Sequence, residues 1–344
     1  MLTSGMALPS PKSFLSPLHC LSMSNRGCNF AASKIKTMSL LTVGTMAYDA
    51  LETPYGKTDR ILGGAATYIA LSASYHVEKS NIVSVVGADF EQQHLDLLAG
   101  KGVDLEGVQI IPDGKTFFWK GKYHTDMNTR DTLDTQLNVL ESFNPIVPEG
   151  FKDCKYLMLG NLMPSIQQKV LDQLPTRPKM VVLDTMNFWM DHFWDDLMIA
   201  LKGVDVLTIN DEEARQLSEE YSLVKAAQKI MTMGPKYLII KKGEHGALLF
   251  HEDKVFSAPA LPLAEVFDPT GAGDTFAGGF IGFLAKTDDI SFENMKRAVI
   301  WGSAMAIFTV EKFGTERIAE LTTEEINLRL EEFKNLMSVD IQLV

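Results

Sequence analysis

Cysteine is scarce in this sequence of 344 residues, which contains only Cys20, Cys28 and Cys154. Their spacing matches neither a disulfide framework nor a set of zinc ligands, so we expect free thiols in a reducing compartment such as the cytoplasm. Long apolar runs are also missing. No stretch approaches the ~20 residues that a membrane-spanning helix needs, and we therefore expect no membrane partner.

Positive charge is in short supply as well. Lys and Arg together number 32 against 44 Asp and Glu, which gives a formal net charge of −12. A net-acidic surface repels polyanions, so nucleic acid is not expected as a partner. A small anionic ligand stays compatible with this charge, because local hydrogen-bond donors can outweigh a distant field.

Residues 1–37 contain no Asp or Glu and are rich in Ser. We expect this segment to be a disordered extension outside the fold. An organelle transit peptide has such a composition. Alternatively, the segment is translated from upstream sequence and Met38 is the true start. The lack of an evident amphipathic pattern favours the second interpretation.

From residue 38 onward, short apolar runs alternate with helical patterns. Strands that alternate with helices of ten or more residues indicate βαβ units and a mostly parallel sheet. We therefore predict an α/β domain over residues 38–344. The expected strands include Tyr156–Leu159, Met180–Leu183, Val204–Ile209 and Tyr237–Ile240.

The most informative segment runs from Asp268 to Phe280 and reads DPTGAGDTFAGGF. Its glycines allow the backbone to turn sharply and to approach a ligand closely. A helix follows, and the free N–H groups at its start can bind an anion and stabilise negative charge on a phosphoryl group. Asp274 lies in the first turn of this helix, where it can accept a proton from a hydroxyl. It could alternatively serve only as a helix cap.

This segment resembles the C-terminal signature of the PfkB/ribokinase family of carbohydrate kinases. The resemblance extends over about residues 40–316, because further motifs follow in the family's order. It implies a ribokinase-like three-layer αβα domain with a mostly parallel central sheet. It also implies a small β-sheet lid, formed by elements near residues 45–60 and 114–136. An edge of the lid is a candidate surface for a homodimer, by analogy with some relatives.

The resemblance also implies a set of site residues. The catalytic set comprises Asp274 as general base and Gly271, Ala272 and Gly273 as the anion-binding turn. The acceptor would be bound by Asp49, Gly63, Gly64 and Thr67. The nucleotide would be bound by Asn210, Lys242, Gly243, Gly246, Thr270 and Ser303. Asn210 and Glu213 would act on Mg²⁺ through water, and Asp268 would hold a monovalent cation such as K⁺.

Several positions depart from the family's pattern, and they bear on substrate choice. The family often has Asn where Thr67 stands. Arg130 could hold a phosphate on the acceptor, although a lone surface arginine is the alternative. Trp189 and Trp194 follow a strand end and could stack on a base or a sugar, with ordinary packing as the alternative.

The sequence thus predicts ATP-dependent phosphoryl transfer to a hydroxyl of a sugar or sugar-like molecule. Three other interpretations are open: a nucleoside kinase on the same fold, a ligand sensor without activity, and a vitamin or pyrimidine kinase of the wider superfamily. A sensor needs no general base, so the intact Gly271–Asp274 segment argues against it.

Overall fold

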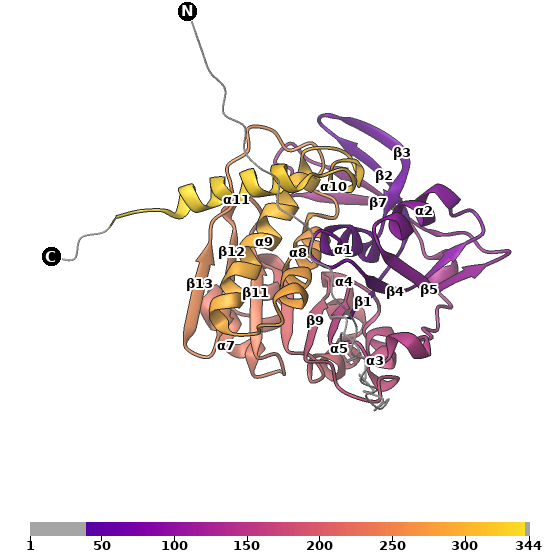
Figure 1. The fold of residues 1–344 in the computed structure, drawn as a ribbon, viewed down its shortest axis with the longest axis horizontal. Helices are drawn as coiled ribbons and strands as arrows, with labels where there is room; N and C mark the ends of the chain where they lie inside the picture. The colour runs from indigo at the N-terminus through magenta and orange to yellow at the C-terminus, as the bar shows by residue number, and fades with distance from the viewer. Residues whose placement is uncertain (1–38, 341–344) are drawn as a thin grey trace, which may run out of the picture. The chain divides into compact units, whose positions relative to one another are not determined.

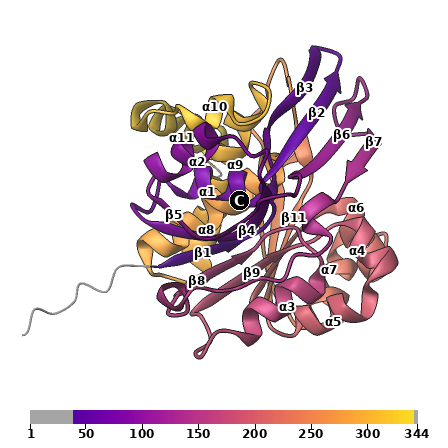
Figure 2. The same cartoon turned by 90° about the vertical axis from the view of Figure 1, so that its right-hand side faces the viewer.

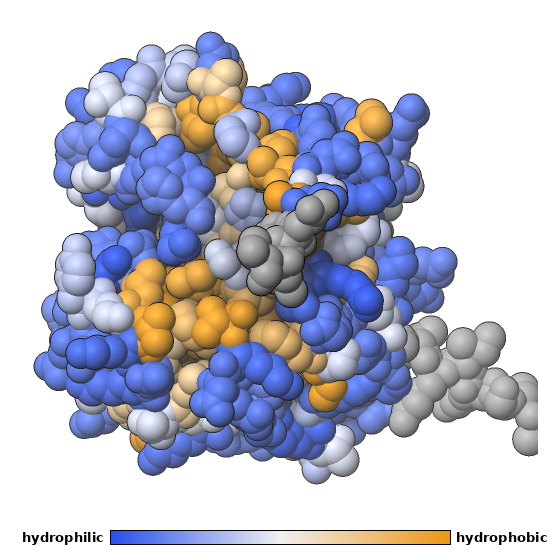
Figure 3. Space-filling model, turned by 90° about the vertical axis from the view of Figure 1, so that its left-hand side faces the viewer, coloured by the Kyte–Doolittle hydropathy of each residue, from blue (hydrophilic) through white to orange (hydrophobic). Residues whose placement is uncertain are grey.

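The computed structural model describes residues 39–340, which belong to one compact unit. Our expectation about residues 1–37 lies outside the described residues. None of the helices in the described part is long and apolar enough to cross a membrane. Figure 3 shows one face of the domain, where hydrophilic residues surround patches of apolar ones.

A nine-stranded sheet forms the centre of the domain, in the order β13-β12-β11-β10-β9-β8-β1-β4-β5 (Figure 1). The seven strands from β11 to β5 run parallel, and β12 and β13 are antiparallel additions at one edge. The strands span β1 Leu40–Val43, β4 Ser80–Gly87, β5 Val103–Ile111, β8 Tyr156–Leu159, β9 Met180–Asp184, β10 Val206–Asn210, β11 Tyr237–Lys241, β12 Ala247–His251 and β13 Lys254–Ala258.

Helices cover both faces of this sheet, as Figure 2 shows from the side. Helices α1, α8 and α9 pack on one face, and α3, α5, α6 and α7 pack on the other. The helices span α1 Ala65–Ala73, α2 Gln92–Gly100, α3 Pro164–Asp172, α4 Asn187–His192, α5 Trp194–Leu201, α6 Asp211–Ser218, α7 Leu223–Met231, α8 Ala272–Thr287, α9 Phe292–Val310, α10 Glu316–Ala319 and α11 Thr323–Met337. The predicted three-layer αβα architecture is therefore confirmed.

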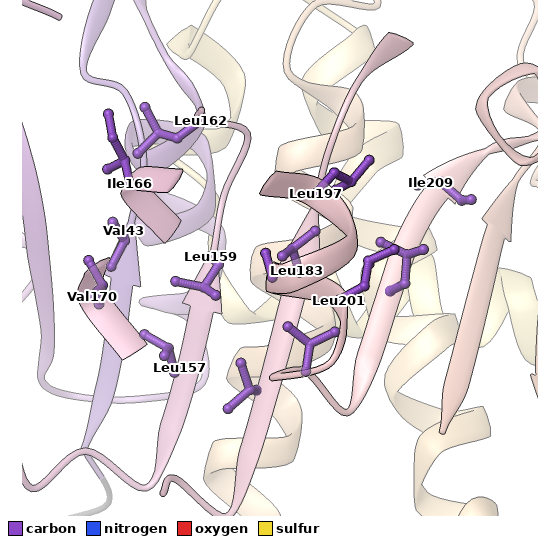
Figure 4. Close-up of a cluster of buried hydrophobic side chains, with 14 of the residues drawn as sticks. Val43, Leu157, Leu159, Leu162, Ile166, Val170, Leu183, Leu197, Leu201 and Ile209 are labelled. Carbon is purple, nitrogen blue, oxygen red and sulfur yellow. The ribbon is translucent and has the colours of Figure 1, made fainter. Parts of the chain in front are cut away.

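The alternation of side chains along each strand explains why both faces are apolar. In β8, Leu157 and Leu159 point to the core under α3 and α5, whereas Tyr156 and Met158 belong to the core on the opposite face. Figure 4 shows the first of these cores, in which Val170 lies near the leucines of β8. A strand buried on both sides reads as a continuous apolar run, which is the pattern that predicted a parallel sheet.

A second, four-stranded sheet has the order β3-β2-β6-β7 and projects from the domain in Figure 2. Its strands are β2 Ala47–Thr53, β3 Gly56–Gly63, β6 Phe117–Tyr123 and β7 Arg130–Gln136. These ranges fall within or close to the two segments that we expected to form a lid. Every residue of the edge strand β7 is exposed. The function of the sheet as a lid and its use in a homodimer stay predictions.

Candidate active site

The carboxyl ends of three adjacent strands bring polar side chains together. Strands β9, β10 and β11 lie side by side in the sheet and end at Asp184, Asn210 and Lys241. Ligands of open α/β sheets bind beyond the carboxyl ends of the strands. This edge of the sheet is therefore the expected place for a site, although the sequence reasoning assigned a binding role only to Asn210 of the three.

The start of α8 forms the turn that we predicted to bind an anion. Gly271 has a φ of +75°, and a Cβ there would lie 2.4 Å from the Tyr68 ring, so only glycine fits. The amide of Ala272 donates to the Pro269 carbonyl at 3.2 Å. Among residues 39–340, the amides of Gly273 and Asp274 have no backbone acceptor. These two donors remain available to an anion at the positive end of the helix dipole.

Asp274 lies in the first turn of α8, with a strongly perturbed carboxyl group. Burial raises its pKa to about 7, to which the carboxylates of Asp184 and Glu213 add, while the Lys241 ammonium opposes the shift. A general base works best when its pKa lies near the operating pH. The environment of Asp274 thus suits proton abstraction near neutrality.

Asp49 lies in β2 of the small sheet and packs against the glycine pair. Its carboxylate is so close to Gly63 that a Cβ at residue 63 would fall 2.0 Å from Oδ2. Gly64, with a φ of +93°, forms the N-cap of α1. Burial raises the pKa of Asp49 to about 8, and the negative charges of Asp268 and Asp274 add to the shift. The predicted acceptor residue Asp49 therefore lies close enough to the predicted base for the charge of Asp274 to act on it.

Tyr68 is a candidate site residue to which our sequence reasoning gave no role. Its side chain is 1% exposed, its ring covers Gly271, and its hydroxyl has no hydrogen-bond partner within the described residues. Burial raises the pKa of this phenol, and the negative charges of Asp268 and Asp49 raise it further. Thr67, the residue we had selected, is fully buried on the same helix, and its role stays a prediction.

Asn210 and Glu213 hold each other in place at the start of α6. The Asn210 side chain accepts from the Glu213 amide at 2.8 Å, and the Glu213 carboxylate accepts from the Asn210 amide at 2.7 Å. Burial raises the pKa of Glu213 to about 7, and the Lys241 ammonium opposes this. No group of three or more His, Cys, Asp or Glu within residues 39–340 could hold a metal ion alone. A Mg²⁺ that is bound mainly by nucleotide phosphates and water needs no such group.

The loop after β11 contains the predicted nucleotide residues. Gly243 and Gly246 have φ angles of +52° and +82°, and a Cβ at Gly246 would lie 2.1 Å from the Ala258 carbonyl oxygen. A Cβ at Gly243 would lie 3.0 Å from Oδ1 of Asn128 in the β6–β7 turn. The small sheet thus reaches this loop. The nucleotide-binding roles of these glycines, and those of Lys242 and of the buried Ser303 on α9, stay predictions.

The segment before α8 is anchored from two sides. The Asp268 carboxylate accepts hydrogen bonds from the amides of Thr270 at 2.9 Å and Gly314 at 2.8 Å. The Thr270 hydroxyl donates to the Tyr123 hydroxyl of β6 at 3.1 Å. The hydrogen bond between Thr270 and Tyr123 connects the small sheet directly to the turn before α8. The sequence did not single out Tyr123 for this contact.

Comparisons with known proteins identify the family of this chain. Residues 38–321 match the model of the pfkB family of carbohydrate kinases. A cytidine kinase from Thermococcus kodakarensis is 31% identical over 250 residues, which cover 71% of this chain and 87% of the relative. A nucleoside kinase from Methanothermobacter thermautotrophicus is 25% identical over 306 residues, covering 80% of this chain and 91% of the relative.

Solved structures show the same fold. A Burkholderia thailandensis nucleoside kinase in complex with inosine has a TM-score of 0.68 at 24% identity, covering 85% of this chain and 97% of that protein. A ribokinase II from E. coli in complex with ATP and Mg²⁺ has a TM-score of 0.71 at 20% identity, covering 85% of this chain and 99% of that protein. The chain therefore belongs to the pfkB family of carbohydrate kinases and is a phosphotransferase with the ribokinase fold.

Proposed function

We propose that this kinase transfers the γ-phosphoryl group of ATP to a hydroxyl of a sugar or sugar-like acceptor, with Asp274 as general base. One observation carries the proposal: the Asp274 carboxyl group lies in the first turn of α8, where the amides of Gly273 and Asp274 have no backbone acceptor within residues 39–340, and desolvation raises its pKa to about 7. In-line phosphoryl transfer requires positioning and electrostatic stabilisation more than covalent chemistry. The base and the anion-binding turn are the two parts that this reaction needs.

The acceptor side of the site is formed by Asp49, Gly63, Gly64 and Thr67. The Asp49 carboxyl group binds acceptor hydroxyls, and the glycines allow the acceptor to approach the backbone. Asp274 then takes the proton of the attacking hydroxyl. The amides at the start of α8 stabilise the negative charge that develops on the phosphoryl oxygens.

The nucleotide side is formed by the strand ends and the loop after β11. Lys242, Gly243, Gly246, Thr270 and Ser303 bind ATP, in keeping with the ATP and Mg²⁺ present in the E. coli ribokinase II structure. Asn210 and Glu213 would hold Mg²⁺ through water, and the ion supplies charge neutralisation on the phosphates. Asp268 would hold K⁺ through the carboxylate lone pairs that its two amide donors leave free. A cytoplasmic location is part of the proposal, and the free, buried thiol of Cys154 is compatible with it.

Nucleosides are the second candidate class of acceptor. They carry a ribosyl hydroxyl, so the same base and anion-binding turn would serve them. The relatives named as cytidine and nucleoside kinases favour this class. The indole N–H of Trp189 donates to the Asn161 side chain at 2.7 Å, just beyond β8 and β9, which places an aromatic side chain near the carboxyl edge of the sheet.

The test is ATP-to-ADP turnover against a panel of sugars, sugar phosphates and nucleosides. The native protein is compared with Asp274→Asn and with Asp253→Asn, a control in the exposed turn between β12 and β13. We expect one acceptor class to turn over with the native and control proteins and to fail with Asp274→Asn. An acceptor that binds tightly without turnover, with unchanged affinity in Asp274→Asn, would indicate a ligand sensor instead.

A further inference from the structure

Lys241 is the last residue of β11 and lies at the centre of the candidate site. Its backbone pairs with Asn210 of β10. Its side chain is only 18% exposed, which is unusual for lysine because burial of an ammonium group is costly. No role for this residue follows from the motif reasoning above, which selected its neighbour Lys242.

The Lys241 ammonium has one hydrogen-bond partner and a defined direction. It donates to the Asp184 carboxylate at 2.7 Å, and its remaining N–H groups have no partner within residues 39–340. A Cβ built at Gly273 would lie 3.0 Å from Nζ, which places the ammonium group close to residue 273. The ammonium group therefore reaches the anion-binding turn of α8.

The charges around Lys241 keep it protonated. Burial alone would lower its pKa, but the carboxylates of Asp184 and Glu213 outweigh this effect, and the net shift is upward. A buried ion pair is a weak source of stability, because desolvation of both ions offsets their attraction. Here the pair lies at the turn that we predict to bind phosphate, and the ammonium group has N–H groups that Asp184 does not occupy. Such a pair suits the binding of an anion.

We propose that Lys241 is a catalytic residue whose ammonium group donates to the oxygens of the transferring phosphoryl group at the start of α8, and that Asp184 is the positioning residue that holds it there. This inference rests on the proposed phosphoryl transfer. In that step the bond between the γ-phosphorus and the ADP oxygen breaks, and the acceptor oxygen bonds to the phosphorus. The acceptor proton moves to Asp274, and Lys241 keeps its own proton throughout.

This arrangement brings the Gly273 amide and the Lys241 ammonium group together. Within residues 39–340 this amide is one of the two donors of the turn without a backbone acceptor, and the Lys241 ammonium lies close to the same residue. Two neutral dipoles and one full positive charge then converge on one anion. The full charge is the stronger of these interactions, because hydrogen bonds from ionised donors are roughly twice as strong as neutral ones.

The experiment compares the native protein with Lys241→Met, Lys241→Arg and Asp184→Asn. Lys236→Met is the matched control: Lys236 precedes the opposite end of β11 and is paired with the buried Asp205 at 3.3 Å. Affinities for the magnesium complexes of ADP and of the ATP analogue AMP-PNP are measured by calorimetry. Turnover is measured with the acceptor that the native protein accepts, and thermal unfolding confirms that each variant folds.

We expect Lys241→Met to lower kcat on the order of 10²- to 10³-fold, the usual effect of removing one transition-state donor. It should weaken binding of AMP-PNP more than that of ADP, because the ammonium group contacts the transferring group. Lys241→Arg keeps the charge and should retain more activity than Lys241→Met. Asp184→Asn should lower kcat less than Lys241→Met, and Lys236→Met should match the native protein.

Unchanged kcat in a folded Lys241→Met variant would overturn the inference while the proposed function stands. Equal losses of ADP and AMP-PNP affinity would also overturn it, because a merely structural role disturbs both nucleotides alike. A native protein that neither binds AMP-PNP nor phosphorylates any acceptor would overturn the proposed function, and the role of Lys241 with it.

Discussion

Replacing Asp49 with Asn should stabilise the folded protein while it weakens acceptor turnover. Asp49 is 5% exposed, and burial raises its pKa from 3.8 to about 8. The folded state therefore holds a proton on this carboxyl group at pH values where the unfolded chain has released it. Asn has nearly the same shape as a protonated Asp and needs no proton.

The magnitude follows from linkage between protonation and folding. Each pH unit between the unfolded and folded pKa values costs about 1.4 kcal/mol. From 3.8 to pH 7 the cost for Asp49 amounts to about 4 kcal/mol of unfolding free energy. The raised pKa of Asp49 does not affect the unfolding free energy below about pH 4. It lowers the unfolding free energy as the pH rises from there, and the loss is complete above about pH 8. The Asp49→Asn variant avoids this loss.

The assay is chemical denaturation of native protein and Asp49→Asn at several pH values from 5 to 8. The difference in unfolding free energy should grow with pH, in favour of the variant. Asp253→Asn, in an exposed turn, should show no such growth. A difference that is the same at every pH, or a variant less stable than the native protein at pH 8, would refute the electrostatic reasoning.

Three further predictions concern the catalytic turn. First, kcat/KM should fall about tenfold per pH unit below an apparent pKa of about 7, because Asp274 is active as the carboxylate; a pH–rate profile measures this. Second, Tyr123→Phe removes the acceptor of the Thr270 hydroxyl, a loss of about 1 kcal/mol, and should raise ATP hydrolysis in the absence of acceptor. Third, Gly271→Ala would bring Cβ to 2.4 Å from the Tyr68 ring, and steady-state assays should show kcat reduced by about 10²-fold.

The sequence is most informative where a contiguous segment determines the local structure. The DPTGAGD segment predicted the anion-binding turn and the position of Asp274, because the whole unit lies within seven neighbouring residues. Alternating apolar runs predicted the parallel sheet for a similar reason, since each buried strand shows its own pattern. Asn210 and Glu213 were also selected from a contiguous motif that the resemblance implies, and the structure adds that they form a capping box at the start of α6.

The residues that the sequence missed depend on contacts between distant segments. Lys241 and Asp184 are 57 residues apart and meet only because β9 and β11 flank β10. Tyr68 could not be distinguished from Thr67, because all nine residues of α1 are buried and the helix shows no polar face. Hydrophobic periodicity identifies the buried face of an amphipathic helix. It gives no information when every face of the helix is buried.

The electrostatics of the site show why such distant contacts matter for the chemistry. Asp184 raises the pKa of Asp274 and Lys241 lowers it, so the two members of this ion pair act on the base in opposite directions. Burial is then the dominant influence on the base, and Glu213 adds to it. A carboxyl group that is buried this way is strong enough to take a proton near neutrality, while the paired ammonium group stays charged for the phosphates. One arrangement thus supports a base and a cation side by side without either neutralising the other.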